Sequence, residues 1–148
     1  MLLIHSLLRW AIVLAGIWAV IRALKGVNGK TPFTGADNKA GLFFMIFFDL
    51  QLLVGLALYF FFSDIAKTGL ADMGAAMKNS TLRFFTVEHE TLAILAFILV
   101  HVGKAKVKKA ASDAQKHKLA LIFYGIALLL VLILTPWPFR AALGKGWI

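Results

Sequence analysis

The sequence contains no cysteine, and only 7 of its 148 residues are acidic, against 16 that are lysine or arginine. Without cysteine the chain has no disulfide framework, thiolate nucleophile, cysteine-ligated zinc or iron–sulfur cluster. The motifs GxxxxGK, GxGxxG, GxSxG and HExxH are also absent. These motifs bind phosphates or dinucleotides, or carry the nucleophile or zinc of a hydrolase. The sequence therefore gives no support to those enzyme classes.

Hydrophobic residues make up 61% of the chain and charged residues only 16%, whereas soluble domains average about 45–50% and about 25%. The apolar residues gather in four runs, at 2–21, 41–62, 82–102 and 119–134. Each approaches the roughly 20 residues that cross a bilayer as a helix. Pro136 and Pro138 end the last run, because proline cannot continue a helix. The sequence predicts one all-α domain, an integral membrane bundle of four helices running up and down.

The positive charges predict how this bundle is oriented. Ten lysines and arginines flank the first and third connections, and five lie on the other side. By the positive-inside rule, the first and third connections are cytoplasmic and both termini periplasmic, in a bacterial inner membrane. The basic run at 103–118 is expected to attract anionic lipid. No nucleic-acid-binding motif accompanies the charge, so we expect no nucleic acid partner.

The connection at 63–81 spaces Ile65, Leu70, Met73 and Met77 roughly as a short amphipathic helix in the outer interface would. An irregular loop is the alternative. Ser80 or Thr81 is expected to cap the helix that follows.

Several ionisable residues fall within or beside the apolar runs, where they are costly and mark candidate functional sites. They are His5, Arg9, Asp49, Glu88, His89, Glu90 and His101. His5 lies 17 residues before Arg22, about 25 Å of helix, and His89 lies 15 residues before Lys104, about 22 Å. The two imidazoles are thus predicted at one depth in the outer half of the membrane. Two facing histidines can ligate the iron of a haem; alternatively, each only hydrogen-bonds a neighbouring carbonyl.

Arg9 follows His5 by four residues and shares its helix face. We expect its partner to be acidic: a haem propionate, Glu88, Glu90 or Asp49. His101 is rotated by 120° from His89 around a helix, so the two do not form one seam. Asp49 is ten residues from Lys39, about 15 Å from the inner surface, whereas His101 is only about 5 Å from that surface. The two could meet through a tilt, as a second polar site or a proton relay. His117, between Lys116 and Lys118, is expected to be a solvated surface residue.

The segments LIHSLLRW, DLQLLVGLALYF, LRFFTVEHE and PWPF resemble those of small bacterial four-helix membrane proteins commonly labelled cytochrome b. The resemblance runs over nearly the whole chain. It implies that His5 and His89 are haem-iron ligands. A second haem at Asp49 and His101 is disfavoured, because a carboxylate is a poor haem ligand beside imidazole.

The sequence thus predicts a membrane cytochrome with one b-type haem, held by His5 and His89 with Arg9 nearby. Such a protein would pass electrons between membrane quinol and a periplasmic redox protein, and would be an electron-transfer component rather than an enzyme with its own substrate site. Two alternatives stay open. One is a cofactor-free accessory or assembly subunit, and the other is a small proton- or metal-linked transporter that uses the acidic residues and histidines.

Overall fold

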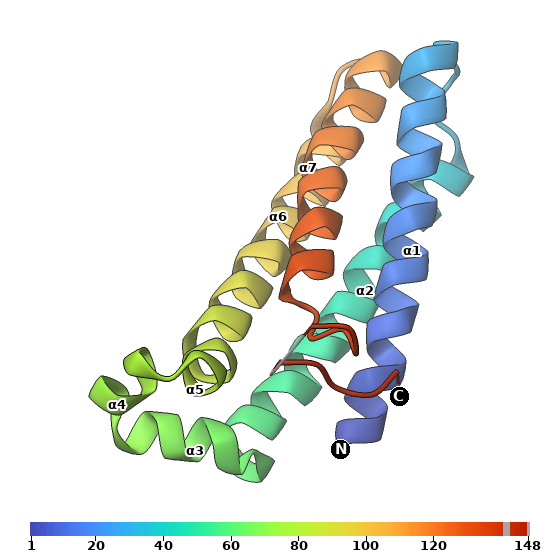
Figure 1. Ribbon diagram of the computed structural model, residues 1–148. Helices are drawn as coiled ribbons and strands as arrows, with labels where there is room; N and C mark the ends of the chain where they lie inside the picture. Colours follow the sequence, from blue (N-terminus) through green and yellow to red (C-terminus); the bar gives the residue numbers. More distant parts are fainter. Residues whose placement is uncertain (141–142, 148) are drawn as a thin grey trace.

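The computed structural model describes residues 1–140 and 143–147, and all regular elements in these ranges are helical (Figure 1). The predicted all-α class is therefore confirmed. Four long helices are joined by two π-helical segments and three short helices. In chain order the elements are α1 (Leu2–Gly29), α2 (Gly35–Ala57), η1 (Leu58–Phe62), α3 (Asp64–Ala71), α4 (Met73–Lys78), α5 (Ser80–Arg83), η2 (Phe84–Glu88), α6 (His89–Lys109) and α7 (Asp113–Leu134).

Four continuous helical stretches are long and apolar enough to cross a membrane: Leu2–Gly29, Gly35–Phe62, Ser80–Lys109 and Asp113–Leu134. They contain the four predicted apolar runs. Their outer surfaces are covered with exposed leucine, isoleucine and phenylalanine side chains, which suits contact with lipid. These properties indicate a multi-pass membrane protein.

The helices extend well beyond the apolar runs that predict them. α1 continues past Arg22 and Lys25 to Gly29, and α6 continues to Lys109. An apolar run marks the part of a helix that can contact hydrocarbon, whereas the backbone hydrogen bonds continue into the polar interface. The first connection is consequently only a short turn, and Lys30 occupies its left-handed position with a φ of 49°.

Side-chain caps fix where the helices begin. Thr34 and Asp37 form a reciprocal capping box at the start of α2, and the Ser112 side chain accepts the Gln115 N–H at the start of α7. In the connection between α2 and α6, the prediction that Ser80 or Thr81 caps the helix is wrong. Asn79 is the cap, because its amide oxygen accepts two backbone N–H groups of α5.

Consecutive long helices run in opposite directions, and both termini lie at the same end of the molecule as α3, α4 and α5 (Figure 1). α1 packs against α2 and α7, and α6 packs against the same two helices. α1 and α6 therefore face each other diagonally. Any group that bridges these two helices must lie in the interior of the bundle.

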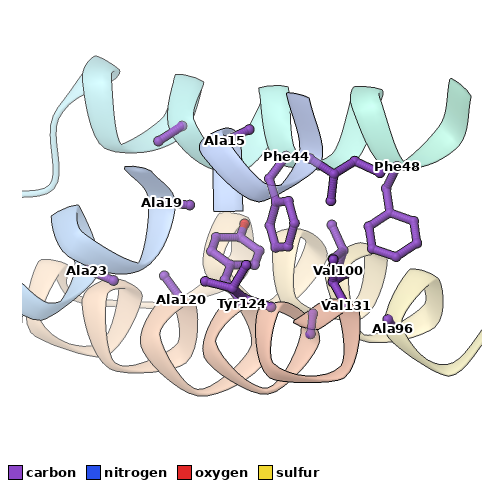
Figure 2. Close-up of a cluster of buried hydrophobic side chains, with 14 of the residues drawn as sticks. Ala15, Ala19, Ala23, Phe44, Phe48, Ala96, Val100, Ala120, Tyr124 and Val131 are labelled. Atoms are coloured by element: carbon purple, nitrogen blue, oxygen red, sulfur yellow. The ribbon is translucent and has the colours of Figure 1, made fainter. Parts of the chain in front are cut away.

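Small side chains let the helices approach closely in the centre of the bundle (Figure 2). Ala15, Ala19 and Ala23 line one face of α1 and are 6% exposed or less. The aromatic rings of Phe44 and Tyr124 fill the space that remains, with edge-to-face packing at 6.0 Å between centroids. Further buried members of this core are Phe48, Ala96, Val100, Ala120, Ala127 and Val131.

Candidate functional site

Two histidines from diagonal helices meet at the end of the bundle that holds the termini. His5 lies in the first turns of α1 and His89 is the first residue of α6. Their ring centroids are 6.2 Å apart, and the ring planes are inclined by 55°. The proximity predicted from counting helix depth is therefore confirmed.

The His89 ring is oriented by the backbone of another helix. Its Nδ1 lies 3.0 Å from the carbonyl oxygen of Leu134, the last residue of α7. Because a carbonyl only accepts, Nδ1 is the N–H donor and Nε2 keeps its lone pair. Metal-ligating histidines are commonly held in this way, by a hydrogen bond from the nitrogen that does not bind the metal.

The His5 ring has one partnered nitrogen and one buried nitrogen without a partner. Gln51 of α2 places its amide nitrogen 3.2 Å from His5 Nε2, while His5 Nδ1 is buried and unpaired among the described residues. Gly55, one turn beyond Gln51, leaves room for this ring: a Cβ there would lie 3.3 Å from His5 Cε1. An amide N–H only donates, so in this arrangement Nε2 accepts and the unpaired Nδ1 carries the ring proton. Turning the Gln51 amide over would reverse these roles and leave Nδ1 with a lone pair for a ligand.

Sequence reasoning missed the residues that surround the two imidazoles. Gln51 and Gly55 lie four residues apart on α2 and therefore share one face of the helix. This spacing could have predicted that a polar and a small residue of α2 face the same neighbour. The π-helical segment η2 ends directly before His89, and such segments often accompany functional sites. It places the buried Phe84 ring 5.8 Å from the His89 ring.

Arg9 has a different environment from the predicted one. Its Nη2 donates to the carbonyl oxygens of Trp147 at 2.6 Å and Gly146 at 3.4 Å. The guanidinium carbon also lies 5.7 and 5.8 Å from the ring centroids of Trp10 and Trp137. None of the predicted carboxylates contacts it in the described part of the chain. Arg9 binds the C-terminal segment to α1, one turn from His5.

Replacing Arg9 by leucine is expected to loosen this C-terminal segment. Hydrogen bonds from a charged donor contribute about 1.5–3 kcal/mol each, so trypsin should cleave after Lys145 roughly ten-fold faster in the variant. Mass spectrometry of timed digests measures that rate. Leu14→Ala, which alters an exposed residue of the same helix, serves as the control, and equal cleavage rates in wild type and Arg9→Leu would contradict the assignment.

The two glutamates near His89 have separate roles. Glu88 pairs with Arg83 at 2.7 Å, whereas Glu90 lines a cavity of about 270 Å³ between α2 and α6. Tyr59 also lines this cavity, and its hydroxyl donates to the Thr86 carbonyl at 2.8 Å. The cavity thus lies immediately beside His89 and has one carboxyl group in its wall.

Asp49 and His101 meet, although counting along the helices placed them about 10 Å apart in depth and allowed a meeting only through a tilt. His101 Nε2 lies 3.1 Å from Asp49 Oδ1, and both side chains are partly exposed. His101 Nδ1 is occupied by the Phe97 carbonyl at 3.0 Å. No group of three or more histidine, cysteine, aspartate or glutamate residues suited to a metal ion occurs among the described residues. The contact between Asp49 and His101 joins α2 to α6.

His117 is buried, so the prediction of a solvated surface residue is wrong. It is 1% exposed, and its Nε2 lies 3.1 Å from the carbonyl oxygen of Thr31. Lys118 is exposed, and Lys116 is half-buried with its ammonium nitrogen 5.6 Å from the centroid of the Phe33 ring. The histidine fits against Gly26 of α1 and the same Phe33 ring. Its role is to join α7 to the turn that follows α1, at the far end of the bundle from His5.

Comparison with family models, with curated proteins and with solved structures finds no match to this chain. The chemistry of the site therefore follows from its geometry alone. Two half-buried imidazoles lie close together, one oriented by a carbonyl and the other with a buried nitrogen that has no partner among the described residues. Such a pair can supply two axial nitrogen ligands to a metal ion held between α1 and α6.

Proposed function

We propose that the protein is a membrane b-type cytochrome that binds one haem through His5 and His89 and transfers electrons. The observation that carries this proposal is the 6.2 Å separation of the two ring centroids. Metal–imidazole bonds of about 2 Å place two imidazoles on opposite sides of one metal ion with centroids roughly 6 Å apart.

The nitrogen atoms fit this group as well as the ring spacing does. The Leu134 carbonyl holds His89 with Nε2 free to bind iron. His5 would bind iron through Nδ1 once Nε2 carries the ring proton, with the Gln51 amide turned so that its oxygen, which has no partner among the described residues, accepts that proton. A bound haem supplies a one-electron couple between ferric and ferrous iron. The chain contributes the two ligands, the orientation of His89, and a buried Phe84 ring that helps to exclude water from it. Arg9 adds a fixed positive charge one turn away.

The orientation in the membrane is part of the proposal. The bias of ten positive residues against five places the α1–α2 and α6–α7 turns in the cytoplasm and both termini in the periplasm of a bacterial inner membrane. The histidine pair is then near the outer surface. Electrons would pass there between membrane quinol and a periplasmic redox protein.

Reporter fusions test this orientation. A fusion at Lys108 is expected to show cytoplasmic activity and a fusion after Ile148 periplasmic activity, because the positive side of the bundle stays inside. Alkaline phosphatase and green fluorescent protein give opposite readouts at each position. The reverse pattern at both positions would place the histidine pair at the inner surface and contradict a periplasmic acceptor.

The visible spectrum of protein purified from haem-sufficient membranes tests the proposed cofactor. Reduction by dithionite is expected to produce the α band of a low-spin haem b with two imidazole ligands. The visible spectrum also distinguishes a cytochrome from a cofactor-free accessory subunit and from a small transporter, because neither of these contains a chromophore. A colourless wild-type protein would contradict the proposal.

A further inference from the structure

A second cavity lies at the opposite end of the bundle from the histidine pair, beside the turn between α1 and α2. Its volume is about 410 Å³, and the turn is the one that begins after α1 in Figure 1. The residues around it come from α1, from the turn and from the start of α2. They are Trp18, Ile21, Arg22, Lys25, Thr31, Pro32, Thr34 and Asp37.

The charged groups of this cavity leave it with unsatisfied positive charge. Asp37 is the one acidic lining residue, and both its oxygens are used: Oδ1 pairs with Arg22 Nε at 2.7 Å, and Oδ2 accepts from the backbone N–H and hydroxyl of Thr34. Arg22 Nη2 lies 3.3 Å from the Thr34 hydroxyl. Among the described residues, Arg22 Nη1 and the Lys25 ammonium have no hydrogen-bond or ion-pair partner. Arg22 and Lys25 are three residues apart, so they share a helix face.

The wall on the membrane side is apolar. Trp18 is 39% exposed and Ile21 is 45% exposed, and both precede Arg22, the first cation after the apolar run of α1. The Trp18 ring lies 6.2 Å from that of Phe43 on α2, which fixes its position. Tryptophan is typical of the boundary between hydrocarbon and headgroups. The cavity therefore changes from apolar to cationic over about one helical turn, at the point where α1 leaves the apolar run.

We infer that this cavity is a binding site for an anionic phospholipid. The phosphate would be bound by Arg22 Nη1 and Lys25, and the acyl chain would lie along Trp18 and Ile21. A free phosphate ion would satisfy the cations but leave the apolar wall exposed. A zwitterionic lipid would add its own positive charge next to Lys25. The combination of free cations and an apolar wall therefore selects a lipid with net negative charge.

Fluorescence quenching by brominated lipids tests this site. Bromine atoms on an acyl chain quench the fluorescence of a tryptophan that they contact. Trp18 is the one tryptophan at this end of the bundle, because Trp10, Trp137 and Trp147 cluster at the opposite end, near the termini. Nanodiscs would contain wild-type protein and increasing fractions of brominated phosphatidylglycerol or brominated phosphatidylcholine with identical chains. The signal of a Trp18→Phe variant is subtracted. Quenching of Trp18 is expected to saturate at a several-fold lower fraction of phosphatidylglycerol.

Variants identify the cation responsible for this selectivity. A cation near the membrane surface contributes enough attraction for about a five-fold change in binding, so Lys25→Gln should raise the half-saturating fraction of phosphatidylglycerol about five-fold. Lys25→Arg should restore it. Lys39→Gln is the matched control, because Lys39 is also exposed near the start of α2 but does not line the cavity.

Three outcomes would overturn the inference. The first is equal quenching by the two lipids in the wild type, and the second is equal loss of selectivity in Lys25→Gln and Lys39→Gln. The third is abolition of selectivity by millimolar sodium phosphate at constant ionic strength, which would identify a site for the free anion instead. None of these measurements depends on haem, so the lipid site and the proposed cytochrome function can fail independently.

Discussion

Alanine in place of His5 or His89 is expected to abolish the α band of the reduced protein. The two rings are the facing pair between α1 and α6, and either substitution leaves one imidazole to hold the iron. A haem with a single strong ligand is high-spin or is lost during purification. The expected result is therefore a loss of nearly all of the low-spin signal, measured by reduced-minus-oxidised spectra at equal concentrations of folded protein.

Two controls distinguish lost ligation from lost folding. His117→Ala removes a histidine that is bound to the Thr31 carbonyl at the far end of the bundle, and its spectrum should match that of the wild type. Added imidazole should partly restore the low-spin band in His5→Ala, because it can enter the space that the side chain leaves. An unchanged spectrum in His5→Ala or His89→Ala, or a loss in His117→Ala, would show that the ligands are assigned wrongly.

The positions of these histidines could be predicted because a helix has a constant rise. Counting residues back from Arg22 and Lys104, the first cations after the two apolar runs, placed His5 and His89 at one level, and the structure brings their rings together. The same counting placed Asp49 and His101 about 10 Å apart in depth, yet His101 Nε2 lies 3.1 Å from Asp49 Oδ1. The apolar runs therefore predict depth along a helix axis to within about two turns, but they do not predict the tilt and the side-chain reach that bring two residues together.

Contacts that depend on rotation or on distant segments could not be read in this way. Arg9 binds carbonyls of Gly146 and Trp147, about 140 residues further along the chain, and no local pattern encodes that contact. His117 lies between two lysines, which predicts exposure to solvent. It is buried because it lies on the face of α7 that packs against α1. The sequence does not predict the contact between His117 and Gly26 either, because a glycine near a helix end is also typical of a simple helix terminus.

Alanine at Gly26 is expected to destabilise the fold markedly, because a Cβ at this position would overlap the Nδ1, Cγ and Cε1 atoms of His117. The histidine is buried and held by the Thr31 carbonyl, so it cannot swing away without losing that hydrogen bond. Overpacking of this kind costs about 1–3 kcal/mol. Thermal unfolding of the purified protein in one detergent should therefore show Gly26→Ala several degrees below the wild type.

Gly125 offers a matched control, since a Cβ there would meet nothing within 4 Å. Gly125→Ala lies within α7 and should be neutral or stabilising by up to about 1 kcal/mol, through the higher helix propensity of alanine. The double variant Gly26→Ala with His117→Ala removes the overlap, so it should be more stable than the two single effects added together. A coupling of at least about 0.5 kcal/mol is expected for residues in contact. Strict additivity, or equal destabilisation by Gly26→Ala and Gly125→Ala, would show that α1 and α7 do not approach each other through this glycine.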